Sequence, residues 1–489
     1  MNLSLLLHTI RYLLPVQVWY QIKNRAFQAK YVHRDAPSFF IKELRENPIP
    51  REHCLEGNVF SFVNLAHEFT GWGYNEFGNL WTYNQNYFDW LNQDGAAEDG
   101  VRWIDRFIDD VLGHPEKAGM SLDSYPIALR SINWIKFFCR YPGFATKMRL
   151  DSLYSQLKLL EKKLEYHILG NHLLEDAFAL YFGASFFSDR RLLKKAERLL
   201  SSQLKEQILP DGAHYEQSPM YHCILLDRLL DCVNIRKTDE LECFATRMLG
   251  HLESILWTDG SIPLLNDSAL GIAPKPSAIF DYARRLGLKW EAIPLGECGY
   301  RRLVDGDMEA VVDVGNVTAT YQPGHTHADV LSYELRIDGK PVVVDTGVST
   351  YEKNARRQME RSTVAHNCVS VDGKDSLEVW GGFRVGRRAK TTVSVSDANE
   401  VDAVHDGFAK PCRRKFSMAD GRFTVEDWYD GEAVSYVHLA SGEDVSRVQV
   451  EDALCVDENL WKYATEYNRF QDGTALEIRF RDHLKYSIK

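Results

Sequence analysis

The stretch Glu309-Ala-Val-Val-Asp-Val314 lies where the hydrophobic pattern of this 489-residue chain changes. β-Branched residues alternate with other residues there, and similar runs follow at 332–337 and 391–395. Because successive side chains of a strand point to opposite faces, such alternation is typical of half-buried strands. Asp338-Gly-Lys340 and Asp372-Gly-Lys374 supply hairpin turns between these runs. From about residue 300 the sequence therefore predicts an antiparallel β-sandwich.

Upstream of this stretch, from about residue 55 to 290, apolar residues recur at helical spacing. Short turns such as Pro210-Asp-Gly212 and Asp259-Gly260 separate the helices. The clearest helical segments are 153–167, 176–187, 192–208 and 220–235. Runs of helices followed by runs of strands predict an α+β multidomain chain. We expect an N-terminal helical segment at 1–54, a helical domain at 55–300 and the β-sandwich at 301–489.

The composition supports large cores, since 45% of the residues are hydrophobic. Nine cysteines are scattered and form no C-x-x-C pair, which favours a reduced protein over a disulfide scaffold. The formal net charge of −11 argues against a nucleic-acid or anionic-membrane partner. The net charge does not exclude an acidic polymer as substrate, because a cleft can be locally basic on an acidic protein.

The first fifteen residues superficially resemble a secretion signal, but they lack a basic start and a clean cleavage site. His8 and Arg11 also interrupt the apolar run, so we expect an amphipathic first helix. This predicts a cytoplasmic protein, with a periplasmic or secreted location left open. No stretch reaches the roughly twenty apolar residues of a membrane span.

The segment Tyr321-Gln-Pro-Gly-His-Thr-His-Ala-Asp329 is the most informative for function. In a strand, His325 and His327 would share one face and project into one cleft. Asp345 ends the next apolar run and His366 lies beyond it, so His327, Asp345 and His366 would make an N/O-rich divalent site with zinc as its natural occupant. Manganese or calcium stays open, as does a hydrogen-bonded structural role without metal. His325 is left free for chemistry.

Two further polar clusters stand at helix starts. Gly170-Asn-His-Leu-Leu-Glu-Asp176 opens an apolar helix, and Asn171 there also suits a helix N-cap. In the second cluster, residues 211–222, Ser218-Pro219 predicts an N-cap followed by the first helical residue, which leaves Tyr221 in the first turn. Polar clusters gathered at one end of a helical array predict a groove.

In combination these motifs resemble the heparinase II/III-type polysaccharide lyases. The resemblance rests on Asn171-His-Leu-Leu-Glu175, on Asp-Gly-x-His-x-Glu-x-Ser-x-x-Tyr-His at 211–222, and on Gly-His-x-His-Ala-Asp at 324–329. Arg361-Ser-Thr-x-Ala-His-Asn367 and the run 380–388 extend it, so that it covers roughly residues 55–390. It implies an (α/α) toroid followed by an antiparallel β-sandwich, with the cleft between them. It also implies β-elimination on a uronic-acid polysaccharide.

The resemblance assigns roles to the motif residues. Asn171, helped by His172, would stabilise the charge that grows on the uronate carboxylate. Tyr221 is the candidate Brønsted residue, and a base role would require neighbouring positive charge to lower its pKa. His325 would take the C5 proton while Tyr221 protonates the leaving oxygen. His214 and Glu216 would hold substrate or orient Tyr221. By resemblance His327, Asp345 and His366 match ligands of one structural metal.

A basic segment from Arg356 to Arg361, with Arg384, Arg387 and Arg388, offers cations for an anionic polysaccharide. Arg361 and Arg384 are the candidates that touch substrate, and Trp380 would stack on a sugar. Solvated surface charge and plain packing are the alternatives. Two other functions stay open besides the lyase: a uronate C5-epimerase, and a non-catalytic glycan-binding or polymer-assembly protein.

Overall fold

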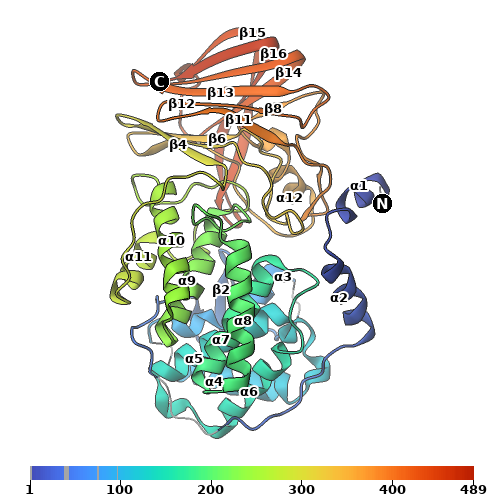
Figure 1. Cartoon of the computed structure of the whole chain (residues 1–489), viewed down its shortest axis with the longest axis vertical. Helices are drawn as coiled ribbons and strands as arrows, with labels where there is room; N and C mark the ends of the chain where they lie inside the picture. The colour runs from blue at the N-terminus through green and yellow to red at the C-terminus, as the bar shows by residue number, and fades with distance from the viewer. Residues whose placement is uncertain (1–2, 38–42, 74–75, 96) are drawn as a thin grey trace.

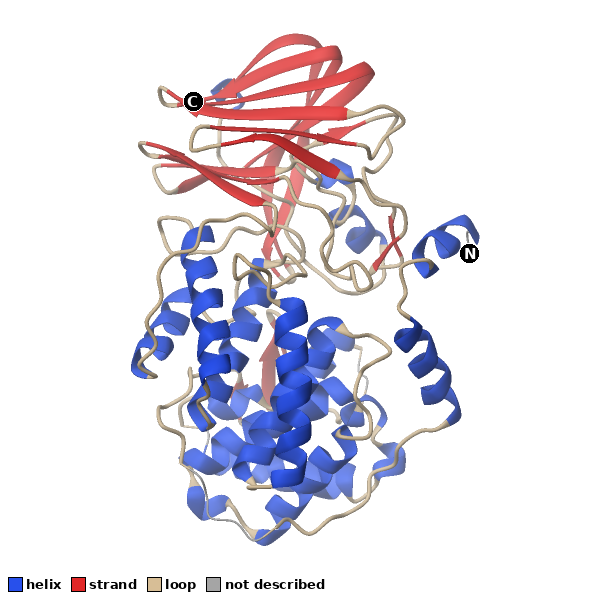
Figure 2. Ribbon diagram, viewed as in Figure 1, coloured by secondary structure: helices blue, strands red, loops and turns tan. Residues whose placement is uncertain are grey.

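A computed structural model describes residues 3–37, 43–73, 76–95 and 97–489. Figures 1 and 2 show a helical domain below a sheet domain, as an (α/α) toroid followed by an antiparallel β-sandwich. This confirms the predicted fold class. The toroid helices are α3 (Asn79–Tyr87), α4 (Ala97–Phe107), α5 (Ser124–Arg140), α6 (Lys147–Leu160), α7 (Gly170–Phe186), α8 (Arg190–Gln207), α9 (Pro219–Ile235), α10 (Asp239–Ile255) and α11 (Pro276–Arg285).

Helix α7 is the centre of the toroid, because it is buried at every position except His172. A helix that is apolar all round must be surrounded, and α5, α6, α8 and α9 pack around it. The following helices begin at side-chain caps. Asp189 caps α8, Thr238 caps α10, and Ser218 accepts a bond from the Tyr221 amide at 3.2 Å, with Pro219 as the first residue of α9. The predicted start of α9 is therefore confirmed.

The sandwich is built from antiparallel strands in the order β11-β12-β13-β14-β7-β6-β5-β4, and β16 joins β14 to β15. Its core is a separate cluster that includes Phe416, Phe423, Phe480 and Tyr486. The predicted turn at Asp338 and Gly339 joins β6 to β7, and both residues have positive φ (53° and 70°).

The strands are β4 (Tyr300–Asp305), β5 (Met308–Asp313), β6 (Tyr333–Ile337), β7 (Lys340–Val343), β8 (Val369–Ser370), β9 (Val379–Trp380), β10 (Arg384–Val385), β11 (Thr391–Ser396), β12 (Glu400–His405), β13 (Cys412–Ala419), β14 (Arg422–Leu439), β15 (Val448–Glu466) and β16 (Arg469–Ile488). A short helix, α12 (Ala355–Glu360), lies between β7 and β8.

The prediction of purely helical structure from residue 55 is wrong at its start. Residues 55–68 form a small sheet of β1 (Leu55–Glu56), β2 (Val59–Phe62) and β3 (Leu65–Glu68). Strands of two to four residues are too short to show a period. Their turns are marked only by positive φ at Gly57, Val63 and Asn64.

The N-terminal arm, residues 3–37, runs from the sandwich to the toroid (Figure 1). It contains α1 (Leu3–Ile10) and α2 (Pro15–Ala26). Met1 and Asn2 of the predicted first helix lie outside the described residues. His8 Nδ1 lies 2.8 Å from Glu378 in the sandwich, and Gln17 donates to the Ile168 carbonyl of the toroid at 3.1 Å. Among the described helices, none combines the length and apolar character needed to cross a bilayer.

Candidate active site

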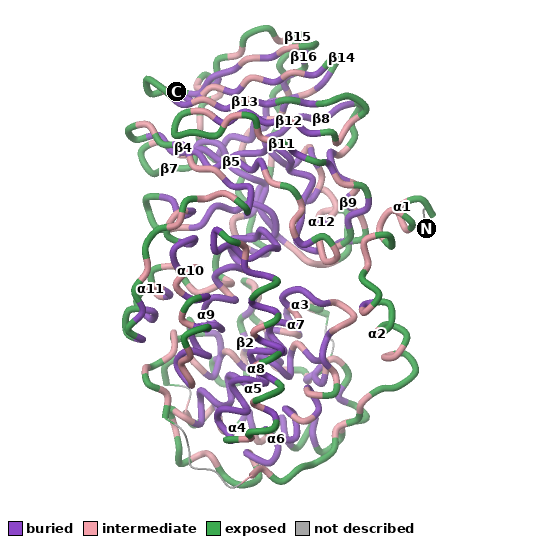
Figure 3. The backbone as a smooth tube through the Cα atoms, viewed as in Figure 1, coloured by how far each residue is buried: buried purple, intermediate pink, exposed green. Residues whose placement is uncertain are grey.

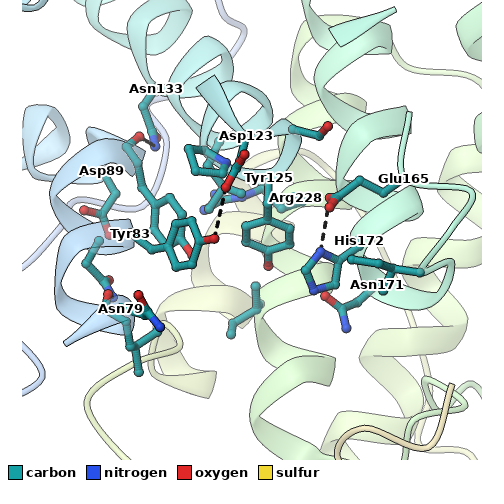
Figure 4. Close-up of a pocket in the computed structure, with 18 of the residues that line it drawn as sticks. Asn79, Tyr83, Asp89, Asp123, Tyr125, Asn133, Glu165, Asn171, His172 and Arg228 are labelled. Carbon is teal, nitrogen blue, oxygen red and sulfur yellow. Dashed lines mark hydrogen bonds and ion pairs between the residues drawn. The ribbon is translucent and has the colours of Figure 1, made fainter. Parts of the chain in front are cut away.

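A cleft of about 1810 Å³ opens between the two domains, and the N-terminal arm forms part of its wall. Aromatic rings follow one side of it: Tyr83 stacks with Tyr87, Tyr87 contacts Tyr125, and Tyr125 lies 4.7 Å from the His172 ring. Figure 4 shows Tyr83, Tyr125 and His172 along this wall. Planar rings at this spacing offer faces for sugar rings along an extended substrate.

The His325 and His327 side chains converge on one carboxylate, that of Asp267. His325 Nδ1 lies 2.9 Å from Asp267 Oδ2, and His327 Nε2 lies 2.7 Å from Oδ1. The predicted strand is wrong here, since residues 321–329 form an irregular loop. The two rings reach Asp267 because the loop folds over it, with His327 fully buried and His325 lining the cleft.

Asp267 is kept ionised by Arg357, which donates to both carboxylate oxygens at 2.5 and 2.7 Å. Burial alone would raise the pKa of Asp267, but Arg357 and the two imidazoles hold that pKa well below its usual range. Arg357 is fully buried, so the interpretation of this residue as a surface cation for substrate is corrected. An ionised Asp267 places the His325 proton on Nδ1 and leaves Nε2 as an acceptor.

Asn171 faces His325 from the start of α7. Its backbone N–H and its Nδ2 each donate to Glu216 at 2.8 Å, and Nδ2 lies 3.3 Å from His325 Nε2. The N-cap prediction for Asn171 is wrong, because the cap is Leu169, with φ 66°, and α7 begins at Gly170. Gly170 has no side chain to collide with Glu216, since a Cβ there would lie 2.4 Å from Oε1. Glu216 is buried, and the two bonds that it accepts from Asn171 hold that residue in position.

His172 reaches the cleft from the next position of α7, and its Nδ1 lies 3.1 Å from Glu165 Oε2 (Figure 4). Burial lowers the pKa of His172, but the charge and hydrogen bond of Glu165 more than offset this, so the pKa is raised. This shift favours the protonated form of the imidazole, which lies next to Asn171 at the start of α7 (Figure 4).

Tyr221 lies against His325, with ring centroids 4.0 Å apart. Its hydroxyl is 3.5 Å from that of Tyr351, and both residues line the cleft. Desolvation raises the pKa of Tyr221, so the lowered pKa that a base role would require is not found. The phenol is therefore a proton donor at neutral pH rather than a resting base.

Four other candidates lie outside the cleft lining. His214 is buried, with Nε2 2.9 Å from Gln207 Oε1. Arg361 is fully buried and donates to the Thr326 carbonyl at 2.8 Å, so it supports the histidine loop and cannot meet a polymer. Trp380 donates to Thr9 at 3.1 Å, and Arg384 stacks on Trp380 at 4.7 Å. We correct the proposed substrate contact of Arg361 on these grounds, whereas those of Trp380, which is partly exposed, and Arg384, which is exposed, stay predictions.

The three predicted metal ligands are buried together behind His325. The His327 and His366 ring centroids are 5.2 Å apart, and Asp345 Oδ2 lies 2.7 Å from His366 Nδ1. His327 Nδ1 and His366 Nε2 are buried without a hydrogen-bond partner. Two such nitrogens beside a carboxylate fit the donor chemistry of a divalent cation. His327 lies in the loop before β6, Asp345 follows β7, and His366 precedes β8.

Within the described residues, ligand atoms converge within 4.8 Å in two groups, and His327, Asp345 and His366 belong to neither: the groups are Asp211, His251 and Cys298, and His33, Asp35 and Asp151. The chain thus carries several groups able to hold a metal. In the buried group, Asp211 already accepts backbone bonds from Ala213, Gly296 and Cys298. That carboxylate is therefore occupied in tying the interdomain linker to the toroid.

Sequence reasoning missed Asp267, Glu165 and Tyr351. Asp267 lies 58 residues from His325, in a turn that carries no motif. Its only signal is that Asn266-Asp-Ser268 follows the apolar run 262–265. Glu165 and Tyr351 have no local signal at all.

Comparisons with known proteins agree with this geometry. Residues 131–270 match the family description Heparinase II/III N-terminus, and residues 288–485 match Heparinase II/III-like, C-terminal. The chain is 23% identical to a heparin-sulfate lyase of Pedobacter heparinus over 73% of its own length, and spans 63% of that relative. A crystal structure of heparinase III aligns with a TM-score of 0.67 and 15% identity, covering 86% of this chain and 79% of that one. A heparan sulfate lyase mutant from Pedobacter heparinus aligns with a TM-score of 0.57 and 14% identity, covering 97% and 87%.

Proposed function

Because the chain belongs to the heparinase II/III family of polysaccharide lyases, we propose that it cleaves a uronic-acid polysaccharide of the glycosaminoglycan type by β-elimination. One arrangement supports the proposal: Asp267 holds His325 through Nδ1, so that Nε2, which the Asn171 amide contacts at 3.3 Å, lies beside the Tyr221 phenol on the cleft wall. A base and an acid adjacent to each other are what an elimination requires.

In the proposed reaction His325 Nε2 removes the C5 proton of the uronate. The electron pair of the C5–H bond forms the C4–C5 double bond, and the C4–O bond breaks. Tyr221 donates its proton to the departing oxygen, which suits a phenol whose pKa is raised. The products are an unsaturated uronate and a free hydroxyl end, and solvent resets the two side chains.

Asn171 and His172 would act on the substrate carboxylate. One N–H of the Asn171 amide is engaged by Glu216, and the other faces His325 Nε2, where a carboxylate oxygen can displace the contact. In its protonated form, which the raised pKa favours, His172 would add charge complementarity. Since negative charge on the carboxylate grows as the C5 proton leaves, both donors stabilise the transition state more than the ground state.

We also propose that His327, Asp345 and His366 hold one divalent ion, with zinc the best match to imidazole and carboxylate donors. The ion would supply structural bracing for the loops behind His325. His327 also contacts Asp267 through Nε2, so it links this group to the positioning carboxylate of His325.

The test is a panel of heparan sulfate, heparin, chondroitin sulfate, hyaluronan and alginate, followed by ultraviolet absorbance of the C4–C5 double bond. Growth of absorbance with at least one polymer supports the lyase. Exchange of the C5 proton in D₂O without absorbance would instead identify an epimerase. Binding of polymer with neither signal would leave a glycan-binding protein.

A further inference from the structure

The outer face of the N-terminal arm is apolar and exposed. Leu3, Trp19 and Phe27 are 67%, 63% and 76% exposed. Figure 3 shows α1 and α2 with largely exposed and intermediate residues along the edge of the molecule. More than half of the exposed large hydrophobic residues of the described chain belong to this arm: Leu3, Leu7, Ile10, Leu14, Val18, Trp19, Ile22, Phe27 and Val32. A patch of this kind on a folded protein marks an interaction surface.

The charge of the arm is opposite to that of the chain. Residues 3–37 contain five arginines and lysines (Arg11, Lys23, Arg25, Lys30 and Arg34) and one acidic residue, Asp35, whereas the whole chain carries −11. Arg11, Arg25, Lys30 and Arg34 are exposed. The net charge of −11, which argues against an anionic-membrane partner, sums over the whole surface and does not describe this arm.

The inner face of the arm is already engaged. Trp380 and Glu378 hold α1, and the Arg388 guanidinium lies 3.8 Å from the Tyr12 ring centroid. Tyr20 in α2 packs on Tyr166 of the toroid, with ring centroids 4.8 Å apart. With its inner side fixed to both domains, the arm cannot bury its outer face against the rest of the chain.

We propose that this arm docks on an anionic lipid surface, with α1 and α2 lying flat on the bilayer. The helices have 8 and 12 residues, which suits an interfacial position. Exposed Trp and Leu side chains enter the headgroup boundary while the arginines and lysines meet lipid phosphates. A second copy of the chain is disfavoured as occupant, because a twofold interface would set this predominantly basic strip against itself.

Docking would bring the cleft close to the membrane. Lys23, Phe27 and Lys30 of the arm also line the cleft. The proposed binding therefore favours polymer that is attached to, or emerges at, a lipid surface.

The test is flotation of the full-length protein with vesicles of phosphatidylcholine alone or mixed with phosphatidylglycerol. We expect binding to the anionic vesicles, weakened by salt, and little to the neutral ones. Trp19→Ser with Ile22→Ser should abolish it, whereas Leu460→Ser, at a residue that is 94% exposed on β15, should not. Arg25→Gln with Arg34→Gln should lower the partition coefficient about thirtyfold, from about 1 kcal/mol per charge. The matched control is Arg190→Gln with Arg198→Gln on the exposed side of α8.

Sedimentation of the same proteins without lipid separates the alternatives. A monomer whose vesicle binding depends on the arm and on anionic lipid supports the proposal. A dimer that dissociates in the Trp19→Ser, Ile22→Ser variant would assign the face to a second copy and overturn it. Equal binding of all variants, or no binding to anionic vesicles, would overturn it as well.

Discussion

His325 Nδ1 lies 2.9 Å from Asp267 Oδ2, and this contact sets the tautomer of the ring that faces the cleft. The carboxylate belongs to the toroid and the imidazole to the sandwich, so the two domains complete the site together. Since Asp267 is held ionised by Arg357, Nε2 of His325 is the acceptor nitrogen of the ring, and it can take a proton once substrate displaces the Asn171 amide. Asp267 is a positioning residue that acts through His325.

The first prediction is that Asp267→Asn lowers kcat by about three orders of magnitude, because the amide no longer fixes the Nδ1–H tautomer. It should also destabilise the fold, since Arg357 loses its buried partner. Asp427→Asn is the matched control, because Asp427 forms a comparable buried pair with Arg414 in the sandwich. Turnover and Tm are measured for both. Equal losses of kcat would reduce Asp267 to a structural residue.

A second prediction concerns the phenol. Tyr221→Phe should abolish turnover with folding and substrate affinity nearly intact, because the oxygen performs the chemistry and little of the packing. Tyr83→Phe removes another cleft hydroxyl, bonded to Asp123, and should keep most of the rate. A Phe variant of Tyr221 that retained more than about a tenth of the wild-type rate, a loss under ~1.4 kcal/mol, would exclude it as the proton donor.

The division into helices and strands could be predicted because periodicity is a local property. The predicted segments 192–208 and 220–235 differ from α8 and α9 by one or two residues at their ends. The segment 153–167 was placed too late, since α6 spans Lys147–Leu160 and a turn follows. Apolar residues in that turn continue the helical spacing without continuing the helix.

The candidate site could be predicted only where a motif is compact. Asn171, Tyr221 and His325 belong to recognisable clusters, and the structure brings them together. Asp267 and Arg357 lie 90 residues apart and meet only through the fold. Charge alone also cannot distinguish a solvated arginine from a buried one, which is why Arg357 and Arg361 were assigned to the surface.

A third prediction is that Asn171→Ala lowers kcat more than it raises KM. Charge on the substrate carboxylate grows in the transition state, so the contribution of the amide is largest there. Asn84→Ala is the control, because Asn84 lines the cleft but bonds within its own helix, to Leu80. Steady-state kinetics on both variants decide the matter. If Asn171→Ala changed only KM and left kcat intact, Asn171 would serve only to bind substrate.

The fourth prediction is a shift of the alkaline limb of the pH profile of kcat/KM. His172 has a raised pKa, so its charge is present at low pH and is lost as pH rises through that pKa. Glu165→Gln removes the main group that raises it, and the limb should move to lower pH. Glu116→Gln, at an exposed glutamate of the cleft, should leave the profile in place. An unchanged limb in Glu165→Gln would show that His172 does not set it.

The last prediction separates metal from catalysis. If His327, Asp345 and His366 hold one divalent ion, protein purified without chelator should carry close to one equivalent by elemental analysis. Chelation or Asp345→Ala should then lower Tm, because the binding energy of a site formed only in the fold contributes to folding. His325→Ala should keep the metal and most of the Tm while losing turnover, since its ring contacts Asp267 and Asn171 instead. If the purified protein carried no metal, the two unpaired imidazole nitrogens would belong to a buried site that binds neither an ion nor water. Loss of the ion in His325→Ala would mean that His325 belongs to the ligand set.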